Sequence, residues 1–316
     1  MLFLGIDTSC YTTSVAVVDD EGRILEDRRR LLSVPEGKMG LRQSEMIFQH
    51  LSNLHEIFPT GYRDFGAVAA SVAPTPEEDS YMPVFNVART FGEIIANTNG
   101  AFFYPLTHQT GHIGAALYGK DRMDGDVLCF HVSGGTTDLL KVRIEKGIIE
   151  KIEPLCSTTD IAAGQLIDRI GVMMGASFPA GGYVSSIAEN GKAADLNFRY
   201  RFDRISFSGA ENQLKDMLES SPLEDVAATL LKHVAKILYK AVSDGMRMTG
   251  IEKTLFFGGV MRSGYIRKFL SERLRDIRFA EVEYSSDNAV GLALQARNIY
   301  MENDHGKTDR RKEDIL

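Results

Sequence analysis

Two histidines spaced four residues apart are the clearest candidates for chemistry in this sequence. On an α-helix, the spacing of His108 and His112 turns both imidazoles to one face, where they can share a divalent metal ion. A metal site needs a third ligand, and Asp287, just ahead of an expected helix, is a candidate. The alternatives are a surface coincidence for the histidines and an N-cap role for Asp287. A zincin-type peptidase is not expected, because Gln109 stands where the general base Glu would be required.

Two short loops of small polar residues are candidates for binding phosphate. They are residues 5–9 (GIDTS) and residues 133–137 (SGGTT). Small residues let backbone amides approach phosphate oxygens, and hydroxyl groups add donors. Asp7, at the end of the first expected strand, is placed to hold a metal ion or its waters. Each loop alone is typical of an ordinary turn, but the pair, with Gly258 and Gly259 after another expected strand, favours a nucleotide site.

The elements that must position these residues form a repeat. Expected strands at residues 2–6, 14–18 and 23–26 surround the first loop, and strands at 127–132, 139–144 and 148–152 surround the second. The copies lie about 125 residues apart, which predicts duplicated lobes that face one another across a nucleotide. Further strands are expected at 65–73, 100–106 and 254–257, and helices at 43–57, 83–96, 161–174, 223–248 and 289–301. This alternation predicts an α/β fold with largely parallel sheets.

Composition is that of an ordinary globular protein. The 316 residues are 44% hydrophobic, and neither a membrane span nor a signal peptide is expected, so the predicted location is the cytoplasm, with no membrane partner. Three scattered cysteines predict neither a disulfide framework nor a zinc cluster. The net charge of −7 argues against a protein that coats nucleic acid nonspecifically. It is compatible with a local basic face.

Three further segments have two interpretations each. Asp160 and Asp168 suit either a ribose or metal contact or a solvated helix face. Residues 178–182 and 206–209 are typical of turns. Residues 197–204 alternate arginines with aromatic residues, which suits RNA phosphates and stacked bases or, equally, a half-buried strand.

Taken in order, these motifs resemble the TsaD/Gcp family, the tRNA threonylcarbamoyl transferases earlier described as O-sialoglycoprotein endopeptidases. The resemblance covers about residues 4–296 and rests on motifs at 5–10, 108–112, 132–135, 160–168, 178–181, 207–209, 258–260 and 286–289. It implies a two-lobed actin-like ATPase (ASKHA) fold with duplicated ribonuclease H-like lobes. The expected lobes are residues 1–106, joined by the C-terminal helix at about 289–301, and residues 107–288 with a helical insertion, followed by a polar tail at 302–316.

The resemblance also implies an activity and its residues. A threonylcarbamoyl or related acyl group would move from its adenylate to N6 of adenosine in tRNA. A divalent metal (Fe, Zn or Mg) would be held by His108, His112 and Asp287, with Asp7 and Ser133 as catalytic residues. The implied residues for ATP, AMP or an acyl-adenylate are His131, Val132, Ser133, Gly134, Gly135, Asp168, Gly181, Gly259 and Ser263. The implied partners are tRNA and either related ASKHA-fold proteins or a second copy of the chain.

Several positions depart from the family pattern. Acids or polar residues of the family are replaced at Tyr11, Thr12, Thr136, Ile161, Gln165 and Ser263, and a Gly-Pro-Gly turn is replaced at residues 73–75. The chain therefore resembles a divergent bacterial paralogue. The alternative function is a nonenzymatic nucleotide-binding partner or regulator of a TsaD-type complex, and a kinase or ATPase ranks lower because no phosphoryl-acceptor base stands out.

Overall fold

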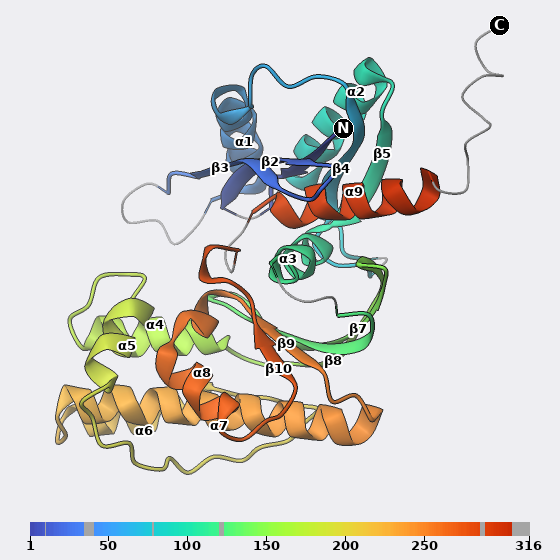
Figure 1. Cartoon of the computed structure of the whole chain (residues 1–316). Coiled ribbons are helices and arrows are strands. Elements are labelled where there is room, and N and C mark those ends of the chain that lie inside the picture. Colours follow the sequence, from blue (N-terminus) through green and yellow to red (C-terminus); the bar gives the residue numbers. More distant parts are fainter. Residues whose placement is uncertain (10, 35–40, 78, 120–122, 285–287, 305–316) are drawn as a thin grey trace, which may run out of the picture. The chain divides into compact units, whose positions relative to one another are not determined.

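The computed structural model describes residues 1–9, 11–34, 41–77, 79–119, 123–284 and 288–304 (Figure 1). Its contacts divide the chain into two compact units. Unit 1 comprises residues 1–124, 144–149 and 286–316, and unit 2 comprises residues 125–143 and 150–285. This division groups residues 107–124 with the N-terminal residues, whereas the sequence prediction began the second lobe at residue 107.

Each unit is built on a five-stranded sheet, and the two sheets have the same strand order. The first runs β3-β2-β1-β4-β5, with β1 Leu2–Asp7, β2 Thr12–Asp19, β3 Ile24–Leu31, β4 Phe65–Ala73 and β5 Phe102–Thr107. The second runs β8-β7-β6-β9-β10, with β6 Gly125–Val132, β7 Thr137–Glu145, β8 Ile148–Ser157, β9 Thr254–Phe257 and β10 Ile277–Phe279. The repeat read from the sequence is therefore a repeat of sheet topology, which confirms the α/β class with duplicated lobes.

The prediction of largely parallel sheets is correct for only part of each sheet. Strands β1, β4 and β5 are mutually parallel, and so are β6, β9 and β10. Strand β2, however, runs antiparallel to both β1 and β3. The links from β1 to β2 and from β2 to β3 are only a few residues long, and a short turn can join only antiparallel neighbours.

The helices of unit 1 cover both faces of its sheet. They are α1 Gln43–Ile57, α2 Phe85–Asn99, α3 His108–Ala116 and α9 Val290–Asp304. Successive residues of a strand point to opposite faces. Leu4 and Ile6 accordingly pack in a core cluster with Leu54 of α1, whereas Phe3 meets the Tyr300 ring of α9 at a centroid distance of 5.5 Å. Figure 1 shows α1 and α2 on one side of this sheet and α9 on the other.

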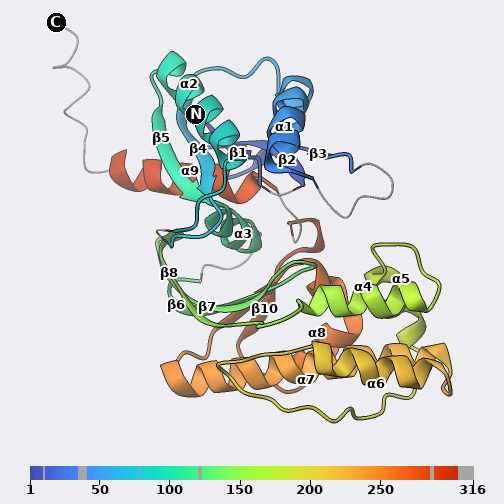
Figure 2. The same ribbon diagram turned by 180° about the vertical axis from the view of Figure 1, so that it is seen from behind.

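Five helices of unit 2 lie on one side of its sheet (Figure 2). They are α4 Ala163–Met173, α5 Gly181–Ala188, α6 Ser208–Leu218, α7 Leu223–Thr249 and α8 Gly264–Ser271. Leu128, Phe130 and Val132 of β6 join residues of these helices in one large core cluster. Two short 3-10 turns, Gly259–Arg262 and Val282–Tyr284, complete the unit. Among the described residues, no helix combines the length and apolar character needed to cross a membrane.

Glycines set the crossing of α3 and α9. A Cβ placed on Gly291 of α9 would overlap the carbonyl oxygen of Gly111 on α3, and one placed on Gly114 would lie 2.8 Å from the carbonyl oxygen of Gly291. The two backbones therefore touch directly. Because α3 carries both His108 and His112, this crossing fixes the helix that presents them.

We expect Gly291→Ala to lower the free energy of unfolding by about 1–3 kcal/mol, because the new methyl group must push two backbones apart. Thermal unfolding followed by circular dichroism measures the effect. The control is Gly209→Ala in α6, where a Cβ meets nothing within 4 Å and should leave stability equal or slightly higher. Equal melting temperatures for Gly291→Ala and the wild type would contradict the packing argument.

Candidate metal and nucleotide sites

The two histidines of α3 face one another. Their Nε2 atoms are 2.9 Å apart, and their ring centroids are 4.3 Å apart. Thr107 caps the helix, because its Oγ1 accepts the Thr110 N–H at 3.1 Å, so α3 begins with His108 in its first turn. Both imidazoles are thus on one helix face, as the spacing predicted, and their Nε2 atoms share a hydrogen bond.

A buried carboxylate holds His108 in this orientation. Nδ1 of His108 donates to Oδ2 of Asp7 at 2.8 Å, since an ionised carboxylate can only accept. Asp7 is 1% exposed and also accepts the Ser71 hydroxyl at 2.5 Å and the N–H of Ser9 at 3.0 Å. With Nδ1 protonated, Nε2 of His108 is an acceptor, and it accepts the Nε2–H of His112 at 2.9 Å. A metal ion would take the place of that shared proton. Asp7 therefore orients a histidine, an arrangement that its position at the end of β1 alone did not reveal.

The histidine pair fits a divalent metal. Imidazole nitrogens bind zinc-like ions at about 2.0–2.1 Å, so two nitrogens this close can share one ion. The third candidate ligand, Asp287, lies outside the described residues, and within the described part of the chain no set of three or more His, Cys, Asp or Glu side chains gathers as a metal cluster. The N–H of Val290 in the first turn of α9 is accepted by Asn288 Oδ1 at 3.0 Å. The capping alternative for Asp287 stays a prediction, because that residue lies outside the described ranges.

The loop between β6 and β7 in unit 2 is shaped by its own serine. Oγ of Ser133 accepts the N–H groups of Gly135 at 3.3 Å and Thr136 at 3.1 Å. The side chain thereby maintains the turn, and its predicted catalytic role stays a prediction. A Cβ on either Gly134 or Gly135 would meet nothing within 4 Å. The backbone of this loop is consequently open to a ligand.

Two other glycines hold the loop from either side. The N–H of Gly164, in the first turn of α4, donates to the Ser133 carbonyl at 3.2 Å, and a Cβ there would lie 2.7 Å from Cα of Gly134. Gly258, after β9, has a φ of +101°, and a Cβ there would lie 3.0 Å from the His131 ring. That ring stacks on Phe257 with centroids 4.8 Å apart. His131 and the fully buried Val132 are therefore packed in place beneath the loop.

Asp168 connects α4 to the start of α5. Its Oδ1 accepts the Ala180 N–H at 2.8 Å, and burial raises the pKa of its carboxyl above the usual range despite this bond. Next to Ala180, a Cβ on Gly181 would meet only Cγ2 of Ile167, at 4.0 Å. The helix start at Gly181 therefore leaves space beside its backbone, although its N–H is also bonded to Asp168, an arrangement that the turn-like sequence at residues 178–182 did not predict.

Gly259 and Ser263 flank a short turn beside β9. A Cβ on Gly259 would meet no atom within 4 Å. The Ser263 hydroxyl is buried and, within the described residues, makes no hydrogen bond. Buried hydroxyls without partners are uncommon, and a bound polar ligand is one way to satisfy them.

The predicted nucleotide residues therefore gather in one unit. Ser133, Gly134 and Gly135 directly follow β6, and Gly259 and Ser263 follow β9, its parallel neighbour, whereas Asp168 and Gly181 belong to α4 and α5. In open α/β sheets the carboxyl ends of the strands form the edge where ligands bind. The histidine pair and Asp7 lie in unit 1, and the nucleotide residues lie in unit 2.

Asp160 has a role that the sequence did not indicate. It stands ahead of α4 and accepts the hydroxyls of Ser206 at 2.5 Å and Ser208 at 2.6 Å, together with the N–H groups of Phe207 and Ser208. Burial opposes its ionisation, but these hydrogen bonds outweigh burial and lower the pKa of Asp160 to about 2. Asp160 thus starts α6 rather than lying on a helix face. A local sequence pattern cannot reveal this cap, because Asp160 and Phe207 lie more than 40 residues apart in the chain.

Residues 197–204 form no strand, so the half-buried-strand interpretation of the arginine and aromatic alternation is wrong. The side chains nevertheless alternate in burial. Phe198, Tyr200 and Phe202 pack against the core of unit 2, whereas the arginines are exposed at positions 199, 201 and 204.

The duplicated sheets place the chain among proteins of the actin-like ATPase (ASKHA) fold. An activator of 2-hydroxyisocaproyl-CoA dehydratase from Clostridium difficile, solved with bound ADPNP, is similar with a TM-score of 0.57 and 14% identity, over 98% of this chain and 99% of that one. A ROK family glucokinase from Streptomyces griseus, in complex with glucose and AMPPNP, is similar with a TM-score of 0.55 and 13% identity, over 94% and 99%. These likenesses confirm the fold alone.

The family follows from the sequence match. The model of the TsaD family, tRNA N6-adenosine threonylcarbamoyltransferase, matches residues 82–294, and the chain belongs to this family. A tRNA N6-adenosine threonylcarbamoyltransferase from Thermosipho africanus (strain TCF52B) is 27% identical over 321 aligned positions, which cover 95% of this chain and 94% of the relative. The resemblance read from the motifs is confirmed, and the family to which the chain belongs is one of tRNA-modifying transferases.

We expect Asp160→Asn to destabilise the protein by about 1 kcal/mol or less at neutral pH, because the cap is solvent-exposed and screened. A folded-state pKa below the unfolded value means that the ionised carboxylate stabilises the fold above the unfolded pKa of about 4. This stabilisation is lost as the pH falls through about 2. Urea unfolding from pH 7 to pH 2.5 should therefore show the variant and the wild type converging at the acid end. Asp216→Asn, which removes an exposed charge from α6, is the control; a constant difference across pH would contradict the charged cap.

We expect Gly134→Ala and Gly181→Ala to weaken AMP binding by about 1.5–3 kcal/mol, the range of one hydrogen bond to a charged group. Each methyl group would fill the space beside the backbone that the phosphate is expected to use. Their melting temperatures should equal that of the wild type. Gly164→Ala is the contrasting variant, since its methyl group clashes with the loop itself and should lower stability. Isothermal titration calorimetry and thermal unfolding separate the two effects. Unchanged AMP affinity in both open-backbone variants would show that the nucleotide binds elsewhere.

Proposed function

We propose that this chain transfers a threonylcarbamoyl group from its adenylate to N6 of adenosine in tRNA. In this reaction N6 attacks the carbamoyl carbon, a C–N bond forms, the C–O bond to the phosphate breaks, N6 loses a proton and AMP leaves. The observation that carries the proposal is the hydrogen-bonded chain from Asp7 through His108 to His112, in a member of the TsaD family.

The histidine pair supports a metal-dependent reaction. His108 and His112, with Asp287 as the proposed third ligand, would hold a divalent ion. When bound, the ion would supply a Lewis acid that polarises the carbamoyl carbonyl or neutralises the phosphate. Asp7 holds the His108 ring so that its Nε2 faces Nε2 of His112, where an ion would replace the hydrogen bond between them, and Ser71 in turn holds Asp7. A scaffold that only binds partners has no need for such an oriented pair.

The glycine-lined edge of unit 2 supports adenylate binding. Gly134, Gly135, Gly181 and Gly259 would let phosphate approach the backbone, and the unpaired Ser263 hydroxyl would gain a partner. Asp168 would accept a ribose hydroxyl while it holds the start of α5. The predicted donation from the loop amides is restricted, however, because Gly135 N–H already donates to Ser133 Oγ.

The test combines activity with metal content. The full-length protein, its family partner proteins, threonylcarbamoyl-adenylate and unmodified tRNA should yield the modified nucleoside, detected by mass spectrometry. His108→Ala should lose both the metal and the product, and Asp7→Asn should weaken metal binding by about 10–100-fold because the histidine is no longer oriented. The matched control is His55→Ala, an exposed histidine of α1.

Three outcomes would contradict the proposal in different ways. Full metal content in His108→Ala overturns the metal assignment. No modified nucleoside, even with the partner proteins present, overturns the transferase activity. Adenylate binding without transfer identifies the chain as a nonenzymatic nucleotide-binding partner of a TsaD-type complex.

A further inference from the structure

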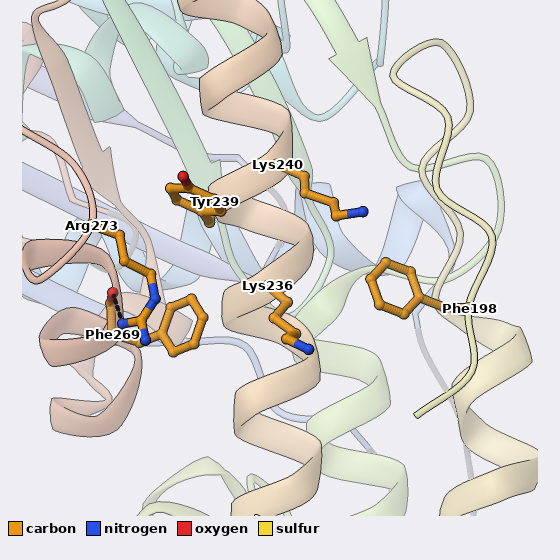
Figure 3. A pocket seen from close by; sticks show the side chains of 6 residues that line it. All are labelled: Phe198, Lys236, Tyr239, Lys240, Phe269 and Arg273. Carbon is orange, nitrogen blue, oxygen red and sulfur yellow. Dashed lines mark hydrogen bonds between the residues drawn. The ribbon is translucent and has the colours of Figure 1, made fainter. Parts of the chain in front are cut away.

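A hollow lined by aromatic and cationic side chains lies on unit 2, and none of the predicted nucleotide residues belongs to its lining. Its volume is about 260 Å³, and its lining consists of Phe198, Lys236, Tyr239, Lys240, Phe269 and Arg273 (Figure 3). These residues come from α7, from α8 and the residues just after it, and from the segment that precedes α6. The lining contains three cations and no carboxylate.

The aromatic rings hold the cations in the hollow. The Lys240 ammonium lies 5.2 Å from the ring centroid of Phe198 and 5.4 Å from that of Tyr200. The Arg273 guanidinium lies 3.9 Å from the ring centroid of Phe269. A cation over the face of an aromatic ring is attracted by the ring's quadrupole, so rings and charges form one surface. Figure 3 shows Lys240 extending from α7 toward Phe198, and Arg273 beside Phe269.

This surface carries more positive than negative charge. Asp195 is shared by two lysines, with its Oδ1 at 2.9 Å from Lys232 and 2.6 Å from Lys236. Arg273 pairs with Glu272 at 3.1 Å, and both side chains are exposed. Exposed ion pairs contribute only about 0–1 kcal/mol, so a phosphate competes with the carboxylate at little cost. A chain with a net charge of −7 thus has a local cationic face here.

We propose that this hollow binds single-stranded RNA, with one base seated against the aromatic rings and the adjacent phosphates on Lys236, Lys240 and Arg273. Cationic grooves with interleaved aromatic rings bind single strands because every base has a π-face. An acidic peptide would use the cations but has no need for the rings. The choice of RNA rests on the proposed function, in which the substrate is a tRNA.

Further evidence comes from the segment that supplies Phe198. Its aromatic residues turn toward the core, whereas Arg199, Arg201 and Arg204 stay exposed along it. Arg201 is paired with Asp203 at 2.7 Å in an exposed ion pair. The cationic surface thus has exposed arginines in the segment that forms one of its walls.

The test measures binding of the full-length chain to a fluorescein-labelled single-stranded RNA of about 12 nucleotides by fluorescence anisotropy, without adenylate. Lys236→Ser and Arg273→Ser should each weaken binding and reduce the slope of log K against log salt by about one. Phe269→Leu keeps the apolar volume but removes the π-face, and should weaken binding at least about fivefold. Lys268→Ala, an exposed cation of α8 outside the lining, should retain wild-type affinity. Thermal unfolding confirms that each variant folds.

The outcomes separate this surface from the proposed reaction. No RNA binding by the wild type, or equal losses in Lys268→Ala and Lys236→Ser, overturns the RNA surface. Tighter binding of a glutamate-rich peptide that displaces the RNA, with affinity unchanged in Phe269→Leu, assigns the hollow to an acidic protein instead. A chain that binds RNA through this hollow but forms no modified nucleoside leaves the inference standing and contradicts only the transfer.

Discussion

Direct contact between backbones, made possible by glycine, is the constraint on which both candidate sites depend. In unit 1, Gly111 and Gly114 of α3 meet Gly291 of α9 with no space for a Cβ. In unit 2, Gly164 and Gly258 press against the loop and strand that carry the predicted nucleotide residues. At each place a side chain would separate elements whose positions define the site. Glycines elsewhere, such as Gly134 and Gly181, have open space instead, and the same residue type thus serves packing in one case and ligand access in the other.

Three aspartates organise the regions around these contacts. Asp7 orients His108, Asp160 starts α6 and Asp168 holds the start of α5. Each accepts hydrogen bonds from groups that lie far away in the sequence or across a turn, so each fixes a local geometry that propensity alone would not produce. Charge-assisted hydrogen bonds are stronger than neutral ones, which suits them to this role. These three aspartates, which the sequence offered as candidates for metal or ribose contact, therefore also fix the local structure around the candidate sites.

The distribution of charge explains how an acidic protein can carry a site for a polyanion. Opposite charges are dispersed in exposed pairs over much of the surface, whereas the hollow beside α7 gathers three cations against aromatic rings. Counting charges along the chain gives only the net charge and not where the charges lie on the surface. Only folding brings residues 198, 236 and 273 together, because they belong to separate elements.

The sequence by itself determined the family, the fold class and most of the elements. Hydrophobic periodicity placed α1 at residues 43–57 and β4 at residues 65–73 as the structure has them. The backbone geometry of each element fixes the spacing of its buried residues, so this spacing can be read from neighbouring residues alone. It missed α5, α6 and α8. Two of these begin where Asp168 and Asp160 accept N–H groups from elsewhere in the chain. Spacing turned His108 and His112 to one face, but only the tertiary structure brought the Asp7 carboxylate to His108, 101 residues away, and the Gly291 backbone to α3. Such contacts depend on distance in space, which local sequence patterns do not encode.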